Sequence, residues 1–207
     1  MGKRTIAAAS AGLLLALVAG ASSKIYIIER LEPDPPKKVA QYSAQDGGLR
    51  YRDPRLDVTA APLLGEERAA YFAARGVADP FASPVLEPTY VLFRVRIENL
   101  MKDEALEFSP GSAMFGNSNA MDEIAVYQLF YKEPDGEARL AAAGKTLFLR
   151  HLRLPPGQWI ERVMVFQYDD PYPTKKIALI LSSILLGRDG TDLEFPFRAS
   201  YRKEKTA

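Results

Sequence analysis

Length, charge and cysteine content already exclude several classes of protein for this chain. It has 207 residues, 47% of them hydrophobic, which is enough for one ordinary globular domain with extensions. The 27 basic and 26 acidic side chains leave a formal net charge of +1, so nucleic acid is not expected as a partner. No cysteine is present, which excludes disulfides, thiolate metal sites, a cysteine nucleophile and a lipid anchor on an N-terminal cysteine.

Residues 1–23 have the pattern of an export signal. Lys3 and Arg4 form a positively charged start, an uncharged run over residues 5–23 follows, and Ala19-Gly20-Ala21 fits the small-x-small rule for cleavage. The run is at the short edge of what spans a bilayer, so the alternative is an uncleaved anchor helix that contacts the membrane. In both cases the charged start stays in the cytoplasm, and we expect the rest to be extracytoplasmic, either periplasmic or secreted.

Residues 24–61 are predicted to form a proline-containing linker. Three prolines between positions 33 and 36 stiffen this stretch, and Gly47-Gly48 loosens it. Such a linker would lift the following domain off a membrane, or trail as a disordered N-terminus after cleavage. Short strands at 25–28 or at 55–58 are the alternative.

Residues 62–88 are predicted to form one short surface helix followed by a loop. The helix would run over residues 62–75, with Pro62 at its start, where helices tolerate proline, and Gly76 directly after its end. Asp-Pro and Ser-Pro pairs punctuate the loop that follows.

From residue 89 onward, turn signals separate short apolar runs, several of which alternate apolar and polar residues as half-buried strands do. A polar tail follows at 203–207. We predict strands over residues 89–99, 106–108, 123–132, 138–142, 146–154, 159–168, 176–186 and 192–202. Seven or eight strands at short spacing, without alternating helices, predict an all-β fold: an immunoglobulin-like β-sandwich over residues 89–202.

The last predicted strand contains a proline. Pro196 has no backbone N–H, so we expect this strand to be an edge or bulged strand. Edge strands leave backbone groups unpaired and are therefore the expected contact surfaces for a partner.

Three segments of the strand region resemble a known kind of module. They are the strand that ends in Ile97-Glu98-Asn99, the turn Leu154-Pro155-Pro156-Gly157 that leads to Val165-Phe166, and the final strand over 193–197. Together they resemble the immunoglobulin-like modules of bacterial exported proteins and lipoproteins. The resemblance implies an architecture and a compartment, but no catalytic residue. The chain departs from the lipoprotein members because it lacks their lipidated cysteine.

Three aromatic residues are candidates for a ligand-binding platform. Trp159, Tyr168 and Tyr172 flank one loop region, and tyrosine and tryptophan are common binding anchors for carbohydrate or peptide. The alternative is that they are ordinary core and rim residues of a sandwich.

Two pairs of aspartates are candidates for a metal site. Asp169 and Asp170 lie in one predicted loop, and Asp189 and Asp192 lie in another. Calcium takes oxygen ligands from such loops, although neither pair has the EF-hand spacing. A shared site requires the two loops to converge, and solvated turns are the alternative.

His151 is the only histidine, and it is interpreted as a surface or hydrogen-bonded strand residue. Imidazole could act as a catalytic base, but a serine nucleophile would need a supporting motif, and no G-x-S-x-G elbow occurs. The serines without such a motif are Ser109, Ser112, Ser118, Ser182 and Ser183.

These observations favour a non-catalytic, exported binding or assembly module of the bacterial cell envelope. It would use no cofactor and would contact an envelope protein through an edge strand. The alternative is an envelope hydrolase or a calcium-dependent carbohydrate-binding domain that uses loops 169–172 and 189–194. A third hypothesis is a bitopic membrane protein whose sandwich belongs to a larger complex.

Overall fold

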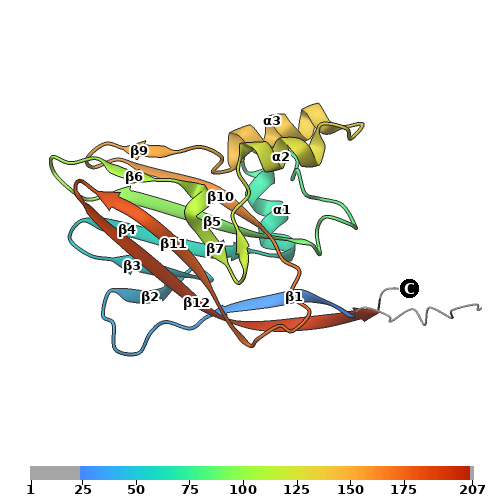
Figure 1. The fold of residues 1–207 in the computed structure, drawn as a ribbon, viewed down its shortest axis with the longest axis horizontal. Coiled ribbons are helices and arrows are strands. Elements are labelled where there is room, and N and C mark those ends of the chain that lie inside the picture. The colour runs from blue at the N-terminus through green and yellow to red at the C-terminus, as the bar shows by residue number, and fades with distance from the viewer. Residues whose placement is uncertain (1–23, 206–207) are drawn as a thin grey trace, which may run out of the picture.

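Two antiparallel β-sheets that share one core make up most of this computed structural model, which describes residues 24–205 (Figure 1). The predicted signal or anchor at 1–23 lies outside the described residues. The first sheet contains β1 (Lys24–Pro33), β6 (Leu106–Phe108), β7 (Ala113–Phe115), β8 (Ser118–Asn119), β9 (Leu152–Leu154), β11 (Lys176–Leu186) and β12 (Asp189–Lys205). The second contains β2 (Tyr42–Gln45), β3 (Gly48–Arg52), β4 (Leu56–Leu63), β5 (Tyr90–Asn99) and β10 (Trp159–Gln167). The prediction of a mainly β chain is confirmed at this level.

The order of strands determines which edges the sheets leave open. The first sheet runs β1-β12-β11-β6-β9, with β7 also paired to β11 and β8 to β7. The second runs β10-β5-β4-β3-β2, so that β2 to β5 form a meander of consecutive neighbours. Phe93 of β5 lies in the core between the sheets, with its ring centroid 4.9 Å from that of Phe115 and 5.5 Å from that of Phe197.

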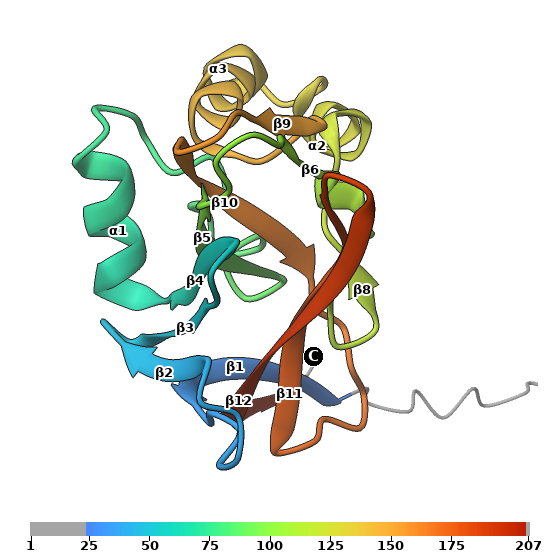
Figure 2. The same ribbon diagram turned by 90° about the vertical axis from the view of Figure 1, so that its left-hand side faces the viewer.

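Three α-helices and one short 3-10 helix complete the fold: α1 (Gly65–Ala73), η1 (Pro110–Ser112), α2 (Glu123–Phe130) and α3 (Gly136–Thr146). Figure 2 shows α2 and α3 together at one end of the molecule. A second apolar core, separate from the first, joins the helices to the second sheet, and it includes Phe72, Phe130 and Val163. The prediction of a single surface helix was therefore wrong.

Residues 24–61, predicted to be a linker, form strands β1, β2 and β3 and most of β4. Ile28 and Leu31 of β1 are 8% and 5% exposed, so this stretch contributes to the core. Asp46 and Gly47, with φ of 47° and 75°, make the two-residue turn between β2 and β3. An Asp-Gly pair is a strong hairpin signal, and its reading as a flexible linker was wrong.

The predicted helix over 62–75 is confirmed in part, since α1 covers residues 65–73. Pro62 does not start the helix. It is the next-to-last residue of β4, where it lies opposite Phe93 of β5. Leu64 is the N-terminal flanking residue of the helix, and its side chain makes no capping hydrogen bond.

Residues 123–132, predicted to be a strand, form α2 instead. The buried side chains Val126 and Phe130 are four positions apart, which is helical spacing. The carboxylate of Asp122 accepts the N–H of Ala125 at 2.8 Å and so caps the start of the helix.

Residues 138–142 belong to α3 and are not a strand. This stretch is rich in alanine, the residue with the highest helix propensity. Arg139 reinforces the first turn, because its Nε donates to Asp135 at 2.8 Å. Its Nη1 donates to the carbonyl of Pro80 and ties the helix to the loop after α1. Within the predicted strand 146–154, only the last three residues form a strand, β9.

The strand that contains Pro196 is not an edge strand, because β12 lies between β1 and β11. The carbonyl of Pro196 accepts the N–H of Asp34 at 3.0 Å, so this residue points its backbone groups towards β1. Since β1 ends at Pro33, the missing N–H of Pro196 lies where the hydrogen bonds between β1 and β12 end. The pairing of β12 with β11 is therefore intact.

Candidate functional site

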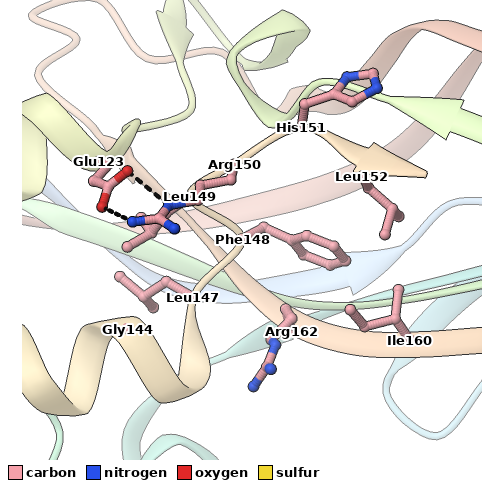
Figure 3. Close-up of a pocket in the computed structure, with 10 residues that line it drawn as sticks. All are labelled: Glu123, Gly144, Leu147, Phe148, Leu149, Arg150, His151, Leu152, Ile160 and Arg162. Carbon is pink, nitrogen blue, oxygen red and sulfur yellow. Dashed lines mark hydrogen bonds and ion pairs between the residues drawn. The ribbon is translucent and has the colours of Figure 1, made fainter. Parts of the chain in front are cut away.

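A hollow of about 360 Å³ lies between the C-terminal end of α3 and strand β10 (Figure 3). Leu147 and Phe148, 5% and 4% exposed, form apolar lining together with Ile160. The remaining lining residues are Glu123, Gly144, Leu149, Arg150, His151, Leu152 and Arg162. The hollow can hold an apolar side chain.

The arginines of this hollow are already used within the fold. Arg150 donates from Nε to Glu123 at 2.8 Å and makes a second bond to the same carboxylate through Nη2. This pairing lowers the pKa of Glu123 and raises that of Arg150. Arg162 donates to the carbonyl of Lys145 in the last turn of α3. Both guanidiniums therefore already have partners within the fold.

The structure brings His151 together with a serine and an acid. Nδ1 of His151 lies 3.0 Å from Oγ of Ser109, and Nε2 lies 3.6 Å from Oε2 of Glu107. The imidazole points away from the hollow in Figure 3, and its side chain is 54% exposed. Arg153 also binds Glu107, at 3.3 Å. Serine is usually activated where water is excluded, whereas the cluster of Ser109, His151 and Glu107 is open to solvent. The cluster lies beside the paired strands β6 and β9.

The three predicted platform residues do not meet. Trp159 is the first residue of β10 and Tyr168 follows its last, so a nine-residue strand, roughly 30 Å long, separates them. Trp159 is 58% exposed and lies under the guanidinium of Arg96, 4.9 Å from its ring centroid. Tyr172 is 84% exposed.

Tyr168 is a core residue. Its side chain is buried, its ring stacks on that of Tyr201 at 6.2 Å, and the two hydroxyl oxygens are 3.2 Å apart. Burial, together with the hydrogen bond to Tyr201, raises the pKa of Tyr168 far above its ordinary value. It therefore stays a neutral packing residue.

The four predicted metal ligands lie in two separate places. Asp169 and Asp170 precede β11, whereas Asp189 and Asp192 follow it, and β11 has eleven residues. Among residues 24–205, no group of three or more acidic or histidine side chains is arranged to hold a metal ion. The convergence that the calcium hypothesis required is not observed.

Three of these four carboxylates have partners within the protein. Asp170 accepts the N–H of Tyr172 at 2.8 Å, and Asp192 accepts the N–H of Ser183 at 2.7 Å. Asp189 pairs with Arg55 at 3.1 Å. These contacts hold the local backbone in place, which is a common role of aspartate.

The ends of β1 and β12 form a surface that sequence reasoning missed. Residues 24–28 pair with residues 201–205, and we call these two segments the terminal ribbon. The ladder between β11 and β12 ends at Arg198, so no third strand flanks the terminal ribbon within residues 24–205. Figure 1 shows it extending from the body of the molecule. The apolar run at 25–28 was the available signal.

The directions of the backbone groups follow from the register. Ala199 donates its N–H to Lys175, on the side away from β1. Because successive N–H groups alternate in direction, Lys203 also points its N–H away from β1. Its partner Tyr26 likewise points outward. Each edge of the terminal ribbon therefore presents an N–H that no strand among residues 24–205 uses.

A second hollow, of about 500 Å³, lies beside the terminal ribbon. Ile27, Arg202 and Glu204 line it from the ribbon, and Leu64 and Pro84 line it from the body. A strand added to the ribbon could place side chains there.

No helix among residues 24–205 is long and apolar enough to cross a membrane. Comparisons of the chain with protein-family models, curated proteins and solved structures found no match.

Proposed function

We propose that the chain is a non-catalytic, exported binding or assembly module of the bacterial cell envelope, which accepts a strand from a partner protein on its terminal ribbon. One observation carries the proposal: the two strands of the ribbon have only each other as neighbours within residues 24–205. A two-stranded ribbon is marginally stable in water, and a third strand would complete it. Strand addition uses the backbone groups that an edge leaves unpaired.

Export is part of the same proposal. The positive start, the uncharged run and the small-x-small box of residues 1–23 support it. The ribbon starts at Lys24, directly after this segment. An uncleaved segment would make the chain a bitopic protein with the ribbon beside the bilayer, and cleavage would release it to the periplasm or beyond.

The immunoglobulin-like assignment also belongs to this proposal. Two antiparallel sheets around a shared core support it. The meander of β2 to β5 differs from the Greek-key connections of immunoglobulin domains. The proposed relation is therefore one of layer architecture.

Edge prolines test the proposal. Tyr26→Pro and Lys203→Pro each remove one outward N–H that no strand within the described residues uses, so the melting temperature should stay nearly unchanged. Ile27→Pro removes an N–H that the ribbon itself uses, and it is the destabilising control.

Partner capture gives the readout. Because the chain has no cysteine, a photoreactive group attached to the thiol of the Arg202→Cys variant labels the ribbon alone. The Arg188→Cys variant carries the same group in the β11–β12 turn and is the matched control. We expect one cross-linked envelope protein from Arg202→Cys, which at least one of the two edge prolines abolishes. Strand addition would be refuted if the Arg188→Cys variant gave the same cross-linked product. It would also be refuted if Arg202→Cys still gave the product in the presence of each of the two edge substitutions, Tyr26→Pro and Lys203→Pro.

A further inference from the structure

The part of the second sheet that the helices leave uncovered has an arginine-lined hollow of about 290 Å³. One row across this face contains Arg50, Thr59, Arg96 and Glu161, on four neighbouring strands. Thr59 is a short residue between two long ones. We call this depression the arginine hollow. Its other lining residues are Gln45, Asp46 and Arg94.

Two of its arginines are held in place. Arg50 donates from Nε to Oδ1 of Asp57 at 2.8 Å and through Nη2 to the second oxygen, and Asp57 is 1% exposed. Arg96 pairs with Glu98 at 2.8 Å. Guanidinium groups fixed in this way lose little freedom when a ligand binds.

Arg94 is the arginine without a partner. The other carboxylates near this face are engaged: Asp57 by Arg50 and Arg52, Glu98 by Arg96, and Glu161 by Arg75 at 2.5 Å. Within residues 24–205, Arg94 makes no ion pair. Asp46 and Glu67, which line the adjoining space beside Arg94, are the remaining acids, and neither makes an ion pair within residues 24–205. Arg94 is therefore the one arginine of this face that none of the acids holds in an ion pair within residues 24–205.

A second, independent observation lies next to Arg94. An adjoining hollow shares Arg94 and Asp46 with the arginine hollow and is also lined by Tyr71 and Arg75. Tyr71 is 6% exposed, and its hydroxyl has no hydrogen-bond partner in the described protein. Buried hydroxyls are normally paired, so an unpaired one beside a guanidinium points to a missing acceptor.

We propose that the arginine hollow binds a phosphoryl group, with Arg94 as its main donor and Arg50 and Arg96 as supporting donors. A planar guanidinium donates two parallel hydrogen bonds to phosphate oxygens, and several converging arginines match the several oxygens of one phosphate. The group comes either from a soluble phosphate ester or from a lipid headgroup. This inference does not depend on strand addition at the ribbon.

Titration of the full chain with inorganic phosphate, followed by calorimetry at constant ionic strength, tests the site. Arg94→Gln removes a side chain that has no ion pair in the fold, so the protein should stay folded while its affinity for phosphate falls about tenfold or more. Arg188→Gln makes the same change of charge in the β11–β12 turn and should leave the affinity unchanged. Equal losses in both variants, or no binding by the wild type, would overturn the proposal.

Two further probes separate the sources of the phosphoryl group. Glycerol 3-phosphate represents soluble esters, and phosphatidylglycerol vesicles represent headgroups, with phosphatidylcholine vesicles of equal size as the neutral control. Arg94-dependent sedimentation with the anionic vesicles assigns the site to a lipid surface. Binding of the soluble ester alone assigns it to small molecules.

Discussion

Asp57 is the most consequential single charge in the described part of the chain, because it is buried and two arginines converge on it. Burial opposes its ionisation, but the hydrogen bonds and charges of Arg50 and Arg52 outweigh burial and lower its pKa below the ordinary 3.8. Asp57→Asn removes the negative charge and replaces one of the two acceptor oxygens with an NH2 donor that faces the guanidiniums. We expect the free energy of unfolding at neutral pH to fall by about 2 kcal/mol, measured by urea denaturation.

The effect of Asp57→Asn should depend on pH in one direction. A carboxyl whose pKa is lower in the folded state adds stability above its unfolded pKa, and this stability is lost as pH falls through the folded value. The difference between variant and wild type should therefore be constant above about pH 5 and shrink below pH 3.8. Asp135→Asn breaks an exposed pair with Arg139 and should cost about 0.5 kcal/mol or less. A pH-independent difference for Asp57→Asn would contradict this account.

At the scale of elements, the sequence predicts strands well where apolar and polar residues alternate. It fails where the secondary structure depends on which side chains are buried. The strands over 89–99, 159–168 and 176–186 match β5, β10 and β11 within a residue or two. In 123–132, β-forming residues dominate the composition, but only Val126 and Phe130 are buried in α2. Propensity is a weak prior, and packing of one face overrode it there.

Two glycines of α3 have opposite roles, and alanine should distinguish them. A Cβ at Gly144 would contact nothing within 4 Å, whereas a Cβ at Gly136 would come 2.1 Å from the carbonyl oxygen of Phe130. Gly144→Ala should raise the free energy of unfolding by about 0.5–1 kcal/mol through helix propensity. Gly136→Ala should lower it by about 2 kcal/mol, because the backbone must move. Thermal unfolding of both variants measures the difference, and equal shifts would contradict the packing at Gly136.

At the scale of the whole molecule, the candidate surfaces depend on contacts between distant parts of the chain. The terminal ribbon joins residues 24–28 to 201–205, and the arginine hollow combines all five strands of the second sheet. No local sequence pattern predicts such pairings between distant segments. Conversely, Trp159 and Tyr168 looked close in sequence, but an extended strand carries them to opposite ends of β10.

The position of β1 in the first sheet makes the N-terminal segment part of the folded body. Leu31 is 5% exposed and lies opposite Ala199 of β12, so Leu31→Ala should lower the free energy of unfolding by about 2–3 kcal/mol. Leu185→Ala, on the same sheet but 42% exposed, should cost about 1 kcal/mol or less. Urea denaturation of the full chain compares the two. If residues 24–61 were a linker, Leu31→Ala would be as mild as Leu185→Ala, and the placement of β1 would have to be abandoned.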